Sequence, residues 1–141
     1  MIKNIAVVLL SLCTIFSCET KKKYTIDKTI LRSFGAKHRD GYIDRIKSHK
    51  EEIAKDSTHV SDYVSITESN IIMFAFGFMS REQTIPEAKV FQEKAYAMDS
   101  LNSRVQEMAG ILHFMDSEWQ ASEKAFKKSL VLNPENLQAR H

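Results

Sequence analysis

The sequence lacks what most enzyme active sites require. Its four glycines are isolated from one another, so no glycine-rich loop is present to cradle a phosphate group. None of its five histidines has another His or Cys three or four residues away, which is the spacing typical of metal ligands on one helix. No Gly-x-Ser-x-Gly motif marks a serine nucleophile. We therefore expect a protein that is not an enzyme, with no catalytic residue, no metal site and no cofactor.

The chain also has no large excess of positive or negative charge. The chain has 20 Lys and Arg against 18 Asp and Glu, which gives a formal net charge of +2. The one basic run is Lys21 to Lys23. Proteins that bind nucleic acid carry a clustered basic face, so we expect no nucleic-acid partner.

Two segments of the chain repeat one another at a spacing of 34 residues. One runs from Ile85 to Ser100 and the other from Trp119 to Pro134. Each begins with a large apolar residue, has two small residues seven positions apart, and ends with a pair that stops a helix. The small residues are Ala88 and Ala95 in the first copy and Ser122 and Ser129 in the second. This period predicts an all-α fold of antiparallel helix-turn-helix repeats that stack on one another.

The second copy resembles the tetratricopeptide repeat (TPR). In the helix expected before this copy, Ala109 and Gly110 are the two adjacent small residues of the family pattern. Gly110 and Ser122 would let this helix and the helix of the copy approach closely. The other matches are Phe126, Ser129 and Pro134, at positions where the family has an aromatic residue, Ala and Pro. His113 is expected to replace an aromatic residue that packs on the neighbouring helix. The resemblance implies an α-solenoid that presents a curved binding surface; a generic helical hairpin is the alternative.

The expected repeat domain covers residues 36–141. It divides into a degenerate unit at about 36–57, a long unit at about 58–100, the best-matching unit at about 101–136 and an incomplete cap at 137–141. An incomplete cap would leave apolar surface on the helix ending near Leu132 uncovered, so we expect possible self-association through this repeat.

The long unit exceeds the next one by nine residues, since Asp56 and Asp99 are 43 residues apart and Asp99 and Asn133 are 34 apart. We expect the surplus in a first helix that is long, or broken near Gly77, followed by a loop from Ser80 to Thr84. The segment from Ile71 to Met79 has no polar side chain. A helix that is apolar on all sides is normally buried, so we expect packing under the preceding unit, with a partner-binding patch as the alternative.

The N-terminus has the features of a secretory signal. A short basic start precedes an apolar run from Ile5 to Ile15, which is too short to span a bilayer. The sequence Ile15-Phe-Ser-Cys18 is similar to the bacterial lipoprotein box, which implies cleavage of residues 1–17 and acylation of Cys18 by diacylglycerol and a further chain such as palmitate. An ordinary signal peptide with an incidental cysteine is the alternative. Because Cys13 would be removed, no intramolecular disulfide is expected.

Residues 18–35 would follow as the lipidated N-terminus and a linker. The run Lys21 to Lys23 would reinforce the anchor by about 1 kcal/mol per lysine on anionic lipid, or would be a solvated linker. Surface-exported bacterial lipoproteins usually have an acidic segment here. We therefore expect attachment to the cell membrane or outer membrane, facing the periplasm.

The first helix of the best-matching unit would line the inner face of the array. Its expected groove residues are Arg104, Glu107, Met108, Ile111, Phe114 and Met115. A groove of mixed apolar and charged side chains is suited to a peptide or helix. The sequence thus predicts a membrane-tethered protein–protein interaction adaptor of the bacterial cell envelope. Two alternatives stay open: a lipoprotein that captures a small ligand or glycan, and a fragment of a longer array.

Overall fold

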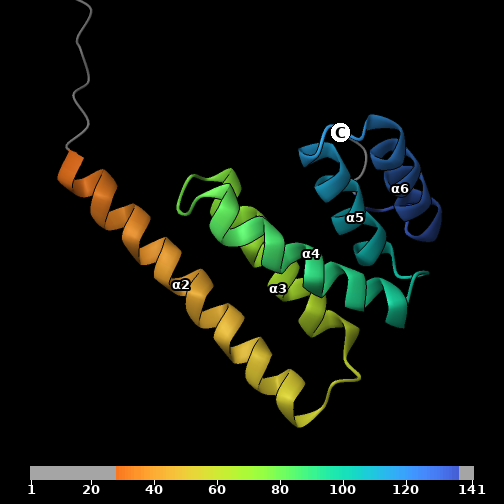
Figure 1. Ribbon diagram of the computed structural model, residues 1–141, viewed down its shortest axis with the longest axis horizontal. Coiled ribbons are helices and arrows are strands. Elements are labelled where there is room, and N and C mark those ends of the chain that lie inside the picture. The colour runs from red at the N-terminus through yellow and green to blue at the C-terminus, as the bar shows by residue number, and fades with distance from the viewer. Residues whose placement is uncertain (1–27, 137–141) are drawn as a thin grey trace, which may run out of the picture. The chain divides into compact units, whose positions relative to one another are not determined.

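The computed structural model describes residues 28–136, and the described part is entirely helical. It contains α2 (Lys28–Lys55), α3 (Val60–Ala75), α4 (Arg81–Met98), α5 (Ser103–Met115) and α6 (Trp119–Leu132), shown in Figure 1. The predicted all-α class is confirmed. The predicted signal peptide, the lipidation site at Cys18 and the incomplete cap at 137–141 lie outside the described residues.

Helices α3 to α6 form two hairpins. α3 packs mainly on α4, and α5 packs mainly on α6, each pair being joined by a short connection. The ends of these helices follow from local chemistry. The Asn102 side chain accepts hydrogen bonds from the backbone N–H groups of Arg104 and Val105 at the start of α5. Asn133 ends α6, and the following Pro134 cannot continue it.

The close approach predicted within the second hairpin is present. A Cβ atom added to Gly110 on α5 would lie 2.8 Å from the Phe126 ring on α6. The Ser122 hydroxyl donates a hydrogen bond of 2.9 Å to the Gly110 carbonyl oxygen. Glycine and serine are therefore small at these positions because the two helices leave no room for more.

The nine extra residues of the first hairpin are distributed over three places. α3 has 16 residues where α5 has 13, and α4 has 18 where α6 has 14. The connection from Ala75 to Arg81 is two residues longer than the connection from Met115 to Trp119. The expected long first helix is thus only part of the explanation.

The predicted loop from Ser80 to Thr84 is wrong. α4 begins at Arg81, and the Gln83 side chain accepts a hydrogen bond of 3.0 Å from the Ser80 N–H. This is one half of a capping box, which stabilises the first turn of a helix. α3 ends at Ala75, and the chain reverses at Gly77, near the predicted break; the φ of 69° at Gly77 is in the left-handed region that suits glycine.

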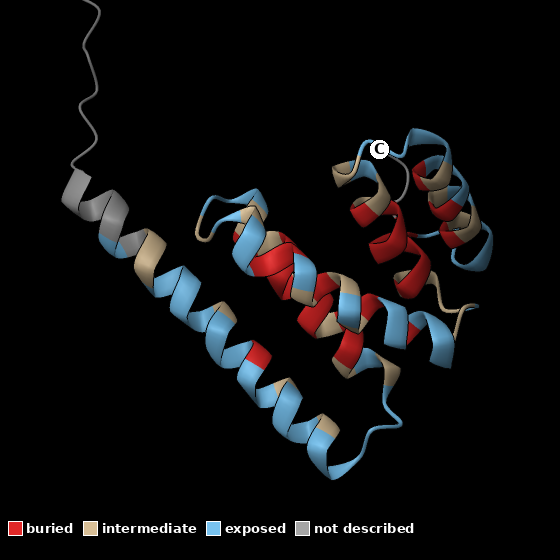
Figure 2. Ribbon diagram, viewed as in Figure 1, coloured by how far each residue is buried: buried red, intermediate tan, exposed pale blue. Residues whose placement is uncertain are grey.

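The main core lies between the two hairpins and within them, as the red segments of Figure 2 show. Val105 and Met108 of α5 pack there with Ile85 and Ala88 of α4. The predicted burial of residues 71–79 is confirmed for Ile71 and Met73 and is wrong for Phe76, which is 72% exposed in the turn after α3.

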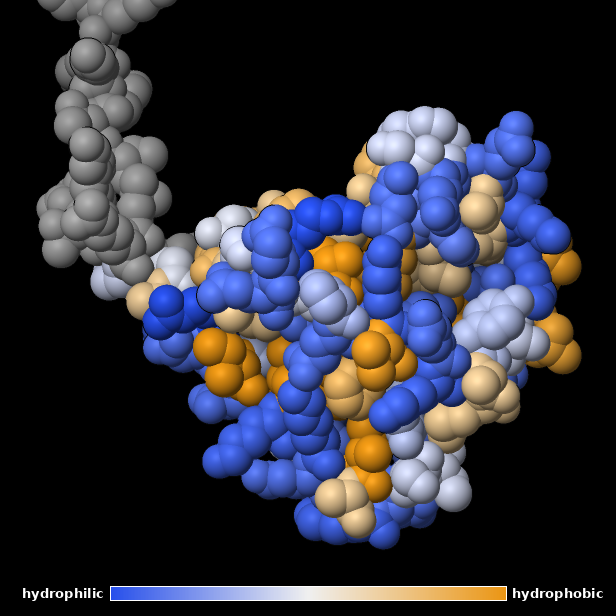
Figure 3. Space-filling model, in the orientation of Figure 1, coloured by the Kyte–Doolittle hydropathy of each residue, from blue (hydrophilic) through white to orange (hydrophobic). Residues whose placement is uncertain are grey.

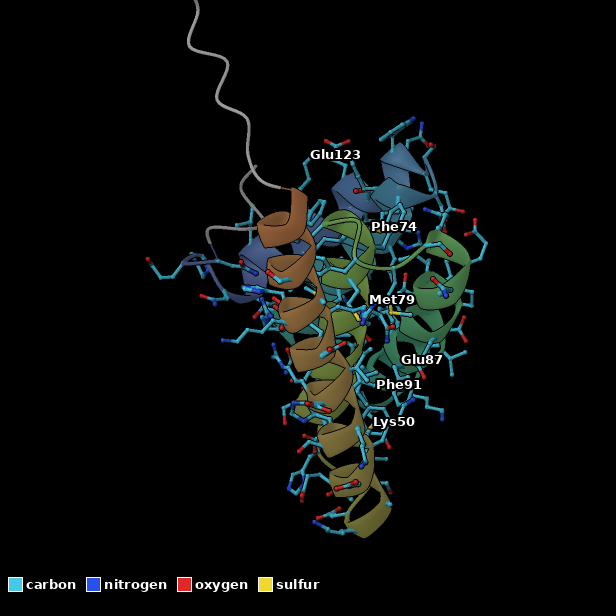
Figure 4. All side chains as sticks on the ribbon, turned by 90° about the vertical axis from the view of Figure 1, so that its left-hand side faces the viewer. Lys50, Phe74, Met79, Glu87, Phe91 and Glu123 are labelled. Atoms are coloured by element: carbon cyan, nitrogen blue, oxygen red, sulfur yellow. The ribbon has the colours of Figure 1, made fainter. Side chains whose placement is uncertain are left out.

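α2 attaches to the hairpins through side chains. Ile46 packs with Ile66 and Met73 of α3 in a small apolar cluster. Lys50 reaches Glu87 and Phe91 of α4, as the labelled side chains of Figure 4 show. The prediction of a helix in the degenerate unit is confirmed, but the helix begins at Lys28, so residues 28–35 are helical and not a linker.

In residues 28–136, none of the helices is both long and apolar enough to cross a bilayer. The molecular face in Figure 3 is mainly hydrophilic, with apolar side chains in small separate patches.

Candidate binding groove

A groove with a volume of about 810 Å³ lies between α4, α5 and α6. α5 runs between the other two helices, so it forms the floor while α4 and α6 form the walls (Figure 1). We call this the α4–α6 groove. On α4 its wall extends from Lys89 to Ala97. At 1.5 Å of rise per residue this distance is about 12 Å, or roughly two turns of a helix.

Short side chains create the hollow. Ala97 on α4, Ala109 on α5, and Ala121 and Ala125 on α6 all line it. Because alanine ends at Cβ, three helices that bring such residues together leave a space that longer side chains would fill.

A buried oxygen of Gln92 lies beneath the groove surface without a hydrogen-bond donor. Gln92 lines the groove and is 6% exposed. Its Nε2 donates a hydrogen bond of 2.8 Å to the Val105 carbonyl oxygen, while its Oε1 has no donor among the described residues. An unsatisfied buried acceptor costs about 1–3 kcal/mol.

At one end of the groove, three charged residues form two ion pairs that share one carboxylate. Asp116, which follows α5, pairs with Lys89 and Arg81 of α4. The hydrogen bond from Lys89, together with the charges of both cations, holds the pKa of Asp116 below its ordinary value. Two cations share one carboxylate, so the cluster keeps one positive charge, and its contacts join α4 to the end of α5.

Some other charged groups in the groove are not paired with an opposite charge within the described part of the chain. Among residues 28–136, Lys124 on α6 and Glu93 on α4 form no ion pair. The Lys128 ammonium lies 5.8 Å from the centre of the Tyr96 ring, across the groove. A cation over an aromatic face is favourable but leaves the positive charge uncompensated.

Two of the six groove residues predicted from the sequence are buried inside the fold. Met108 is 2% exposed and Glu107 is 1% exposed, so the expectation that they line an open groove does not hold for these side chains. Glu107 accepts hydrogen bonds from Arg104 on its own helix and from Asn136 after α6. Burial of a carboxylate requires such partners, and here the partners hold Glu107 in the interior.

Arg104 belongs to the same network. It forms ion pairs with Glu68 of α3 and with Glu107. Partial burial lowers the pKa of Arg104, but Glu68 and Glu107 outweigh this effect and raise it. Its guanidinium therefore connects α3 to α5 and is already occupied.

The other three predicted residues also lie away from the α4–α6 groove. Ile111 and Met115 are partly buried against the main core. Phe114 is exposed, contacts Trp119 edge to face at 5.2 Å, and lines a smaller hollow of about 320 Å³ between α5 and α6.

The α4–α6 groove and the predicted groove use opposite sides of α5. Successive residues are about 100° apart around a helix. Gln106, Ala109 and Leu112, which line the observed groove, therefore face away from Arg104 and Ile111. The sequence signal that could have located the groove is the set of alanines on the three helices.

His113 does not have the packing role predicted for it. Its Nδ1 donates a hydrogen bond of 2.6 Å to Glu118 in the turn between α5 and α6, and its side chain is 40% exposed. The ring therefore stabilises the turn at the edge of the groove instead of filling space between helices.

Within the part of the chain that the structure describes, no group of three or more His, Cys, Asp or Glu side chains is placed to hold a metal ion. Comparison with protein-family models, with curated proteins and with solved structures found no match.

Proposed function

We propose that this protein is a non-catalytic interaction adaptor that binds a peptide or helix of another protein in the α4–α6 groove. The observation that carries the proposal is the groove itself, a hollow of about 810 Å³ lined by alanines and by charges that lack an ion-pair partner among the described residues. Binding grooves combine apolar walls with a few polar groups that fix the orientation of the ligand. The alanines and Leu112 supply the first property, and the wall charges supply the second.

The two hairpins support a second part of the proposal, that they are repeats of the TPR type. Helix pairs recur, and the contact of Gly110 with Phe126 occurs where the family has its small and aromatic residues. Stacked hairpins of this kind bury a continuous core and leave long surfaces for partners.

The location of the adaptor is proposed from the sequence alone. A lipid on Cys18 would tether it to the cell membrane or outer membrane, on the periplasmic side. Self-association is a further proposal. Val131 is 81% exposed on α6, and Trp119 at the other end of this helix is 59% exposed.

The capture of a small ligand or glycan is the second candidate. In its favour, the groove volume is within the range of about 300–1,000 Å³ found for small-molecule sites. Sites for apolar molecules and sugars are rich in exposed aromatic rings, whereas Tyr96 is the only Phe, Tyr or Trp among the groove residues. This composition favours a peptide or helix.

The test is site-specific photo-crosslinking in cells. A benzoylphenylalanine placed at Ala121 would lie in the groove, and the same residue at Lys127 would lie on the same helix outside it. We expect one discrete protein adduct from position 121 and none from position 127. An additional Ala97→Trp substitution, which fills the groove, should abolish the adduct.

Equal crosslinking from both positions, or none from position 121, would contradict binding in the groove. Insensitivity of the adduct to Ala97→Trp would do so as well. An adduct with lipid or glycan in place of protein would support the second candidate.

A further inference from the structure

The two walls of the α4–α6 groove carry free charges of opposite sign. On α6, Lys124 and Lys128 are four residues apart and therefore lie one turn apart on the same side of the helix. On α4, Glu93 faces the groove, and no cation of residues 28–136 pairs with it. A ligand that enters between the walls thus meets positive charge on one side and negative charge on the other.

The remaining charged groups of the groove are already engaged with one another. Lys89 shares Asp116 with Arg81, and His113 is hydrogen-bonded to Glu118. A ligand therefore gains less from these groups than from charges that lack a partner. The charges that remain open to a ligand are those of Lys124, Lys128 and Glu93.

The inner surface of the groove admits a helix backbone. Ala109 on the floor and Ala125 on the α6 wall are buried, and Ala121 on the same wall is partly exposed. Small residues let two helices approach to the short end of the usual interaxial distance of about 8–10 Å. The length of about 12 Å along α4 accommodates roughly two turns of a bound helix.

We infer that the ligand of this groove is an amphipathic helix with an acidic flank and a basic flank. This inference rests on the proposed function and deepens it. Two acidic side chains four residues apart pair with Lys124 and Lys128, and a Lys or Arg on the opposite flank pairs with Glu93. The face between the flanks is made of small and apolar residues and lies over the alanines of the floor.

Charge on both walls sets the direction of the bound helix. A helix turned end for end in the groove would exchange its flanks and place acid beside Glu93 and base beside Lys124. Like charges facing one another across an interface are strongly unfavourable. The groove therefore selects one orientation, which small apolar floor residues alone could not do.

The test uses two designed peptides of identical composition and the full chain in detergent. Both peptides are 15-residue helices with Ala and Leu on one face. The first has two Glu four positions apart on one flank and two Lys on the other flank; in the second peptide each flank carries one Glu and one Lys, so neither direction of binding matches both walls. Fluorescence anisotropy should show that the first peptide binds at least about tenfold more tightly than the second.

Charge substitutions then test whether the walls of the groove cause the preference for the first peptide. Lys124→Glu with Lys128→Glu should abolish the preference for the first peptide, because both walls are then acidic. The matched control is Lys47→Glu with Lys127→Glu, which changes the net charge equally at exposed positions outside the groove and should leave the order unchanged. Far-UV circular dichroism checks that each variant is folded.

A second measurement needs no variant. Raising the salt concentration from about 50 mM to 500 mM shortens the Debye length, so the preference of the natural protein for the first peptide should decrease. Equal binding of both peptides, binding of neither, or an unchanged order in the Lys124/Lys128 variant would overturn the inference. In those cases the crosslink from position 121 still decides independently whether a protein binds the groove.

Discussion

The substitution Gly110→Leu tests the close contact between α5 and α6. A Cβ at this position lies 2.8 Å from two ring carbons of Phe126, which is closer than real Cβ contacts come. Leucine adds three more carbons at the same place. Either the Phe126 ring or the α6 backbone must move, and the hydrogen bond from Ser122 to the Gly110 carbonyl is disturbed.

The expected magnitude follows from two opposing effects. Leucine has a better helix propensity than glycine by about 0.8 kcal/mol. Overpacking of a close contact costs about 1–3 kcal/mol, and more where backbone must shift. We expect a net loss of about 1–2 kcal/mol, which in a domain of this size lowers the Tm by about 4 °C or more.

A matched control is available on α2. Gly41 is exposed and helical, and a Cβ added there meets nothing within 4 Å. Gly41→Leu therefore shows the propensity effect alone and should raise the stability by roughly 0.8 kcal/mol. Urea and thermal unfolding of both variants, followed by circular dichroism, would measure the difference. If Gly110→Leu is as stable as Gly41→Leu, the packing described here is wrong.

Three other results are expected. Cys18→Ala should abolish labelling by a palmitate analogue and release the protein from membranes, because stable anchoring needs at least two acyl chains; a natural protein without label would exclude the lipid anchor. Asp116→Asn should lower the Tm at pH 7 but much less at pH 2. The pKa of Asp116 is held below its ordinary 3.8, so its stabilising effect is complete above that value and is lost as the pH falls below it. Val131→Asp should reduce self-association in sedimentation equilibrium at micromolar concentration, and monomeric natural protein would contradict that proposal.

The features that the sequence predicted well are those set by local chemistry and by the repeat. Gly110 and Ser122 were recognised because the 34-residue spacing places small residues where helices meet. The end of α6 before Pro134 follows from the missing N–H of proline.

The start of α4 differs from the prediction because a local signal and the repeat conflict. The 34-residue repeat aligns Ile85 with Trp119, where α6 begins, and this favours a helix start near Ile85. Ser80 and Gln83 have the spacing of a capping box, and in the structure this signal prevails. Pro86 then lies in the second turn, where it removes one backbone hydrogen bond at an exposed position.

The predicted groove residues lie away from the α4–α6 groove, and the burial of two of them depends on distant partners. Glu107 reads as a surface residue in the sequence. It is buried because Asn136, 29 residues later, and Arg104 satisfy its carboxylate. No local pattern contains that information, and the same holds for the oxygen of Gln92, whose missing donor is visible only in three dimensions.

The way in which α2 is attached affects the local unfolding of the protein. This helix is joined to α3 and α4 through Ile46 and a few ion pairs, such as Arg45 with Glu68 and Lys50 with Glu87. Elements with few buried contacts open without global unfolding, and salt weakens exposed ion pairs further. Such an opening uncovers Ile66 while both hairpins stay folded. Proteolysis that is slower than reclosing follows the population of the open form, so we expect proteolytic cleavage of the native protein to become faster as the ionic strength rises.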